Sequence, residues 1–182
     1  MKHESPPTHL DVKAFAQSSS ELNGHDLLAK YERLMTETQG EGADRMLNWH
    51  ARGEFRGDES GAAQVWLHLT VSTSLPLTCQ RCLGPVDIAM AVSRSFRFVD
   101  SEEAAETQDE EAEEDVLALN RDFNLSELIE DELLMELPVV PRHETCPVDV
   151  KLAVVDPGFD EASAEKRNPF AVLAKLHRGK SR

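Results

Sequence analysis

The chain has 182 residues and a formal net charge of −15, with 40% apolar residues. This length predicts one domain, residues 1–182, with loose appendages, and the apolar content suffices for a modest core. Residues 1–7 lack the apolar region of a secretory signal, and no apolar run reaches the ~18 residues that span a bilayer. These features, with three cysteines that suit a reducing compartment, predict a cytoplasmic protein without a membrane partner.

Short elements are expected before the central part of the chain. Residues 1–10 are expected to be flexible, and Asp11 is a plausible N-cap for a helix over residues 11–17. A linker is predicted over residues 18–24. A second helix is predicted over residues 26–35, because apolar side chains recur there at helical spacing at Leu27, Tyr31 and Leu34.

The middle of the chain predicts a β-sheet. Residues 45–56, 62–75 and 86–99 are strand-like, and the second run alternates most regularly, with Val65, Leu67, Leu69 and Val71 on one face. Short turns between the runs favour antiparallel pairing. His50 and His68 lie in these strands, and neither has a ligand partner at short spacing, so both are interpreted as structural or surface residues.

Residues 100–115 contain ten acidic residues and no basic one. A segment so charged and so poor in apolar residues is typical of a mobile, disordered loop. The functional alternative is that it mimics a nucleic-acid backbone or holds a basic partner.

A strand is expected at residues 116–119, and then a helix that begins after Asn124. Asn124 and Glu127 have the spacing of a capping box, and Pro138 should end the helix near Leu137. Its expected apolar face includes Glu132, for which a structural role is favoured over a functional one, while Glu130 and Asp131 should point outward. The apolar members of that face are Leu125, Leu128, Ile129, Leu133 and Met135.

Cys79 and Cys82 form a C-x-x-C followed at once by Gly84 and Pro85. Three interpretations remain open for this pair. In the first, the pair is half of a zinc site completed by the distant H-x-x-C of His143 and Cys146. In the second it is a redox dithiol, and in the third it is two reduced cysteines in a turn. The redox hypothesis is disfavoured because a strand, rather than a helix, is expected to follow the pair.

The C-terminal segment reverses the charge of the chain. Residues 166–182 hold six basic residues and no acidic one, so a basic tail over residues 175–182 ends an acidic molecule. A helix is expected from Asn168, with Pro169 in its first turn and Phe170 on its apolar face. Such bases can contact phosphates. The candidate contact residues are Lys166, Arg167, Lys175, Arg178, Lys180 and Arg182.

Three blocks of the sequence resemble the YceD family, the large ribosomal RNA subunit accumulation proteins. They are residues 77–82 (LTCQRC), 130–141 (EDELLMELPVVP) and 168–176 (NPFAVLAKL). The resemblance implies a bacterial factor that supports synthesis, processing or stability of 23S ribosomal RNA, with no established catalytic residue to carry over. Its implied partners are ribosomal RNA or its precursor, or a large-subunit ribosomal protein, and no small-molecule substrate.

The expected architecture is α+β: an antiparallel sheet with a few packed helices, an acidic disordered loop and a basic C-terminal tail. The leading hypothesis is a non-enzymatic ribosome-biogenesis factor that contacts ribosomal RNA or a ribosomal protein, with no cofactor or with zinc. An acidic adaptor that binds a basic ribosomal protein is the alternative, and a zinc or thiol enzyme is a third. The chain has no G-x-S-x-G, P-loop, H-E-x-x-H or dinucleotide-binding motif to favour an enzyme.

Overall fold

The computed structural model describes residues 6–57, 63–150, 154 and 170. The chain divides into two compact units, Met1–Cys146 and Pro147–Arg182. Every helix and strand with described bounds lies in the first unit. Among the described residues, no helix is long and apolar enough to cross a membrane.

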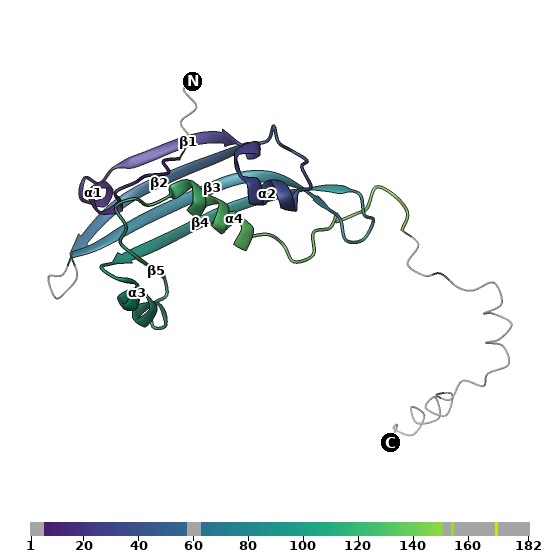
Figure 1. Cartoon of the computed structure of the whole chain (residues 1–182). Helices are drawn as coiled ribbons and strands as arrows, with labels where there is room; N and C mark the ends of the chain where they lie inside the picture. Colours follow the sequence, from purple (N-terminus) through teal and green to yellow (C-terminus); the bar gives the residue numbers. More distant parts are fainter. Residues whose placement is uncertain (1–5, 58–62, 151–153, 155–169, 171–182) are drawn as a thin grey trace, which may run out of the picture. The chain divides into compact units, whose positions relative to one another are not determined.

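The first unit is built on one five-stranded sheet in the order β1-β2-β3-β4-β5 (Figure 1). Neighbouring strands are antiparallel from β1 to β4, whereas β5 runs parallel to β4. The expected α+β class is therefore confirmed, with one parallel strand added at the edge. The strands are β1 (Glu21–Leu27), β2 (Met46–Gly57), β3 (Ala63–Thr78), β4 (Pro85–Val99) and β5 (Asp115–Ala118).

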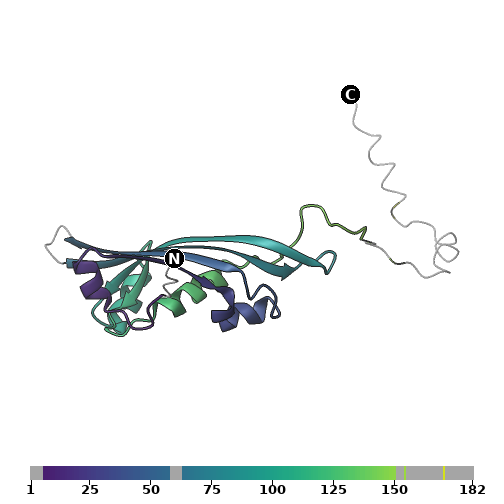
Figure 2. The ribbon, with the colours of Figure 1, turned by 90° about the horizontal axis from the view of Figure 1, so that it is seen from above.

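Short helices cover one face of this sheet, as the view from above shows (Figure 2). Helix α1 packs on β2 and β3, α4 packs on β4, and α2 packs on α4. The expected caps are confirmed: the Asp11 carboxylate accepts from the Ala14 amide and the Asn124 side chain accepts from the Glu127 amide. The helices are α1 (Val12–Gln17), η1 (Leu28–Lys30), α2 (Glu32–Glu37), α3 (Glu102–Asp109) and α4 (Leu125–Met135).

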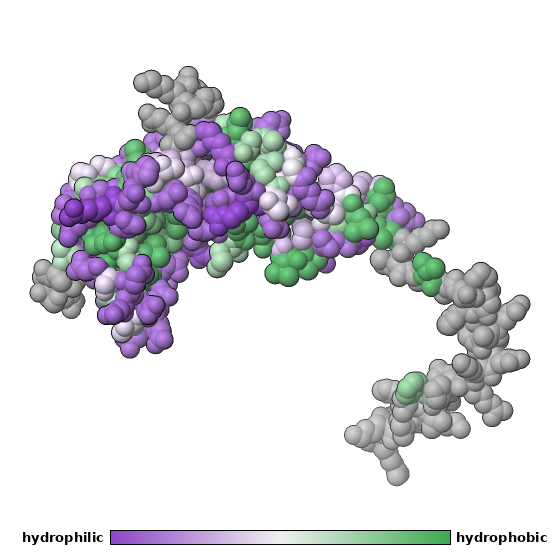
Figure 3. Space-filling model, viewed as in Figure 1, coloured by the Kyte–Doolittle hydropathy of each residue, from purple (hydrophilic) through white to green (hydrophobic). Residues whose placement is uncertain are grey.

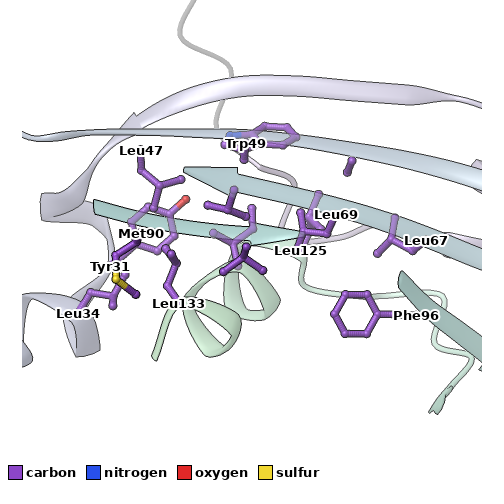
Figure 4. Close-up of a cluster of buried hydrophobic side chains, with 14 of the residues drawn as sticks. Tyr31, Leu34, Leu47, Trp49, Leu67, Leu69, Met90, Phe96, Leu125 and Leu133 are labelled. Carbon is purple, nitrogen blue, oxygen red and sulfur yellow. The ribbon is translucent and has the colours of Figure 1, made fainter. Parts of the chain in front are cut away.

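The core lies between the sheet and these helices (Figure 4). The alternation in β3 is confirmed, since Val65, Leu67, Leu69 and Val71 are all buried. On α4 the expected face is only partly correct. Leu125, Ile129 and Leu133 are buried, but Met135, the last residue of the helix, is 82% exposed.

The helix expected over residues 26–35 is wrong in its first part. Residues 21–27 form the edge strand β1, and the helical residues begin only at Leu28. The strand is set by pairing with β2, where Gly24 lies opposite the large Trp49 and Asp26 lies opposite Leu47. Of the three predicted apolar positions, Tyr31 and Leu34 are buried, whereas Leu27 ends the strand and is 44% exposed. Its neighbour Leu28, in η1, is the buried residue.

The acidic segment is also corrected: residues 100–115 are not a featureless loop. They contain α3, capped by the Ser101 hydroxyl, and they lead directly into β5. Two parallel neighbouring strands require a crossover connection of about a dozen residues or more, and this segment supplies it. Ala105 of α3 is buried, while Arg97 of β4 forms an ion pair with Glu114 at 2.5 Å. The acids themselves remain on the exposed side of the helix.

The N-terminal residues expected to be flexible are anchored where the structure describes them. Leu10 forms an antiparallel bridge with Phe123, and the Pro7 carbonyl accepts from the Leu125 amide. These bonds tie the start of the chain to the entrance of α4. Residues 1–5 lie outside the described part of the chain.

The hydropathy of the surface is uneven around this unit (Figure 3). Hydrophilic side chains cover most of the face drawn there, and apolar side chains show between them. Among the large apolar side chains that are exposed, Leu83, Val139 and Val140 lie near the end of the β3–β4 hairpin and in the segment that follows α4.

Candidate metal centre

The C-x-x-C lies at the tip of the hairpin that joins β3 to β4. The Cys79 amide donates to the Gly84 carbonyl at 2.9 Å, and the Leu83 amide donates to the Cys79 carbonyl at 2.8 Å. The left-handed backbone conformation of this turn lies at Leu83, whose φ is +60°. Strand β4 follows the pair, as expected, and not the helix whose N-terminus would favour a redox dithiol.

A second segment, residues 138–146 after α4, runs alongside this hairpin tip. The Gln80 amide donates to the Pro141 carbonyl at 2.8 Å. Arg81, between the two cysteines, donates through its guanidinium to the carbonyls of His143 and Glu144, the latter at 3.2 Å. The sequence did not single out Arg81, because a side chain that braces a distant backbone leaves no local pattern.

These contacts bring all four predicted ligands together. One side-chain atom each from Cys79, Cys82, His143 and Cys146 lies within 4.8 Å of the other three. The Cys79 and Cys146 sulfurs are 4.0 Å apart, and the Cys82 sulfur is 3.5 Å from Nδ1 of His143. Cys79 is fully buried, and all three cysteines are free thiols.

The spacing matches a tetrahedral metal site. With metal–sulfur and metal–nitrogen distances of about 2.3 Å and 2.0 Å, the ligand atoms of a tetrahedron lie about 3.8 Å apart for two sulfurs and about 3.5 Å apart for sulfur and nitrogen. The distances of 4.0 Å and 3.5 Å are close to these values. A sulfur–sulfur distance of 4.0 Å is about twice the length of a disulfide bond. Three thiols and one imidazole thus form a set suited to zinc.

The electrostatics of the site also suit a cation. Burial raises the pKa of the Cys79 thiol, but hydrogen bonds from the backbone at Cys82, His143 and Arg81 outweigh it and lower that pKa to about 5. Burial raises the pKa of the Cys146 thiol, and its hydrogen bonds to the other two sulfurs raise it further. Deprotonation is therefore favourable at Cys79 and unfavourable at Cys146. A bound cation would remove the free-energy cost of forming the second thiolate.

The other predicted site residues are not placed by the structure. Lys166, Arg167, Lys175, Arg178, Lys180 and Arg182 all lie outside the described residues. Phe170 is described, and its side chain is 69% exposed.

Comparison with known proteins identifies the family. The model of the family "Large ribosomal RNA subunit accumulation protein YceD" matches residues 67–177. The chain belongs to the YceD family. The match begins within β3 and includes all four members of the candidate metal centre.

One curated YceD relative is the Large ribosomal RNA subunit accumulation protein YceD of Haemophilus influenzae. It is 33% identical to this chain over 108 residues, which make up 58% of this chain and 62% of the relative. The alignment thus covers less than two thirds of that YceD protein. No solved structure matches the chain.

Proposed function

We propose that this YceD protein is a non-enzymatic, cytoplasmic factor that supports the synthesis, processing or stability of 23S ribosomal RNA. The observation that carries the proposal is the family match over residues 67–177, whose name describes accumulation of the large ribosomal RNA subunit. That name specifies a role in RNA accumulation and no chemical reaction.

The basic tail supplies a physical means for contact with RNA. Lysine and arginine contacts to phosphates dominate the affinity of proteins for nucleic acids. The six bases of residues 166–182 follow a unit, residues 1–146, that contains 29 acidic and 12 basic residues, a formal charge of −17. Contact with RNA through the first unit as a whole is opposed by this charge, whereas the tail attracts phosphates.

Charge reversal in the tail tests this role. Lys180→Glu with Arg182→Glu should lower co-sedimentation with large-subunit precursors and reduce 23S RNA levels in cells, without lowering the melting temperature. Glu110→Lys with Glu111→Lys is the matched control, since it moves the charge by the same amount in the opposite direction at exposed positions. Unchanged sedimentation and RNA levels in the tail variant would show that the tail is not the contact.

An acidic adaptor is the second candidate, because the charge of −17 on the first unit would attract a basic ribosomal protein. Affinity capture with and without RNase treatment separates the two. Partners that disappear on RNase treatment support contact through RNA, and ribosomal proteins retained after treatment support the adaptor.

We also propose that Cys79, Cys82, His143 and Cys146 hold one structural zinc ion. All four positions are filled by protein side chains, as in structural rather than catalytic zinc sites. Protein purified without chelator should contain about one zinc per chain. His143→Ala should make the zinc content substoichiometric, and His50→Ala, at a half-buried position on the sheet, should leave it unchanged. Absence of zinc from the unsubstituted protein would contradict the assignment.

A further inference from the structure

The sheet has an open face, opposite the helices. Along β3, Val65 and Leu67 point into the core, so Trp66 and His68 point to the other side. The register places Arg52 opposite His68 and Glu54 opposite Trp66, and these side chains share that side. No helix of the described residues lies over this face (Figure 2).

An aromatic and guanidinium cluster occupies one end of the open face. The rings of Trp66 and His68 are nearly parallel, with 8° between their planes and 6.3 Å between their centres. The Arg56 guanidinium lies 4.8 Å from the centre of the Trp66 ring. Both rings are half-buried, so each keeps part of its surface in solvent.

Hydrogen bonds hold this cluster in position. Glu54 accepts from Arg56 at 3.0 Å and from Arg52 at 3.2 Å, and it contacts Nε2 of His68 at 2.9 Å. Nδ1 of His68 lies 2.8 Å from the Ser95 hydroxyl of β4. The Trp66 indole N–H donates to Gln64 at 3.1 Å. The rings and guanidiniums are therefore preorganised on rigid strands, which lowers the entropic cost of binding a ligand.

The charge of this face differs from that of the unit as a whole. The charged residues of β1 to β4 whose side chains lie on the open face are Glu21, Glu54 and Asp87, and Arg52, Arg56 and Arg97. These six charges balance, and Glu114, which pairs with Arg97, adds one negative charge, whereas residues 1–146 together carry −17. The acidic excess lies elsewhere, so the open face is a place where a polyanion can approach without strong repulsion.

We propose that the Trp66–His68 platform, with Arg52 and Arg56 beside it, binds single-stranded RNA. The proposal rests on the proposed function, in which the protein acts on ribosomal RNA. Unpaired bases stack on exposed aromatic rings and on guanidinium planes, while arginines contact the phosphates that connect them. The sequence alone showed no aromatic cluster for such stacking, because the platform combines one tryptophan with a histidine and with arginines from the neighbouring strand.

Tryptophan fluorescence tests the platform directly, because the chain has two tryptophans. Trp49 is buried, and its indole N–H has no hydrogen-bond partner among the described residues, so Trp49→Phe should fold and leave Trp66 as the single reporter. A 12-nucleotide single-stranded RNA of mixed sequence should quench this fluorescence to saturation. The same RNA annealed into a duplex should quench it far less, since its bases are already stacked.

Affinity variants supply the second measurement, by anisotropy of the same RNA carrying a fluorescent label. Trp66→Ala should weaken binding by about five-fold to 100-fold, while Trp66→Phe, which keeps a ring, should weaken it much less. Arg52→Gln with Arg56→Gln should reduce the slope of log affinity against log salt by about 0.7 for each phosphate that is no longer neutralised. Met135→Ala, at an exposed position on α4, is the control and should change nothing. Melting temperatures should confirm that every variant is folded.

Three results would overturn the platform. They are binding of RNA with no change in Trp66 fluorescence, equal affinity in folded Trp66→Ala, and quenching by poly-lysine but not by RNA, which would indicate a basic protein partner. The tail variant Lys180→Glu with Arg182→Glu distinguishes this failure from failure of the tail contact. If Trp66 still responds and affinity for the 12-mer is unchanged in that variant, the platform stands and the tail contact fails. If the affinity of that variant falls and Trp66 fluorescence does not change on addition of RNA, the tail contact stands and the platform fails.

Discussion

The absence of a side chain at Gly53 permits the close contact between α1 and β2. A Cβ added there would lie 2.8 Å from the Ala16 Cα and 2.8 Å from the Phe15 carbonyl oxygen. Both are backbone atoms, so a larger residue must push the helix away from the sheet. At Gly57, in the same strand, no atom of the described residues lies within 4 Å of such a Cβ.

We therefore expect Gly53→Ala to lower the free energy of unfolding by about 1–3 kcal/mol, the usual cost of overpacking. Gly57→Ala should be neutral or slightly stabilising, because alanine restricts the unfolded chain. Urea denaturation of the two variants measures the difference. Equal stabilities would show that α1 does not pack against β2 as described.

Glu132 on α4 is a second residue whose position has a measurable consequence. Its carboxylate lies 3.6 Å from the Arg94 guanidinium of β4, and its side chain is 14% exposed. Burial, followed by the nearby Asp115, raises its pKa despite Arg94. The structure thus gives this inward acid an ion-pairing role, in agreement with the structural role that the sequence favoured.

Because the pKa of Glu132 is higher in the folded than in the unfolded state, the folded state binds the proton more tightly. Its contribution to stability is therefore greatest at low pH and falls as pH rises from the unfolded value, about 4.3, through the folded value. Glu132→Gln should remove this part of the pH dependence in denaturation measured from pH 4 to pH 7. Glu127→Gln, in the exposed first turn, is the control. An unchanged pH profile in Glu132→Gln would contradict the raised pKa.

At the scale of elements, the acidic segment shows how tertiary pairing organises a sequence of low apolar content. The crossover holds α3 through buried Ala105, and the Asp109 carboxylate accepts from the Val116 amide of β5 at 2.9 Å. Helix α2 has no side-chain cap of its own, and Glu130 of α4 supplies one by accepting from the amides of Arg33 and Leu34 at 2.8 and 3.2 Å. Glu130, expected to be a solvated charge, thus links two elements.

Replacing residues 101–114 with a Gly-Ser linker of equal length should lower the melting temperature of the whole unit. The reason is that the linker removes the Arg97–Glu114 ion pair, the Asp109 hydrogen bond and the buried Ala105. Glu106→Gln with Glu111→Gln, two exposed acids of the same segment, should leave the melting temperature unchanged or raise it through lower self-repulsion. If the linker variant melts at the original temperature, the segment is dispensable for folding.

At the scale of the whole molecule, the candidate metal centre closes a long loop. Cys79 and Cys146 lie 67 residues apart, and β4, α3, β5 and α4 all fall between them. A metal bond between such distant residues constrains the unfolded chain as well as stabilising the native one.

Removal of zinc by a strong chelator should therefore lower the melting temperature of the whole unit, and added zinc should restore it. His143→Ala should melt at the lower temperature with or without chelator. Calorimetry of both proteins gives the measurement. A melting temperature of the unsubstituted protein that does not respond to chelator would show that no metal contributes to its stability.

The sequence by itself determined the features that depend on near neighbours. Each of these features rests on periodicity, on a local hydrogen bond or on a residue type with a characteristic chemistry. They are the alternation of β3, the caps at Asp11 and Asn124, the strands of the β3–β4 hairpin and the four candidate ligands. The C-x-x-C and the H-x-x-C are each local patterns. Their pairing was a hypothesis until the fold brought them within 4.8 Å.

Only the tertiary structure decided the features that depend on distant partners. Residues 21–27 form a strand by pairing with the edge of β2, and residues 102–109 form a helix within the crossover that the parallel strands β4 and β5 require. Glu130 links α4 to α2, and Arg81 links the hairpin tip to the segment after α4. The Trp66–His68–Arg56 cluster joins side chains two residues apart on β3 with one from the neighbouring strand β2. A one-dimensional pattern cannot show which residues lie opposite one another, since register and packing set those distances only after the chain has folded.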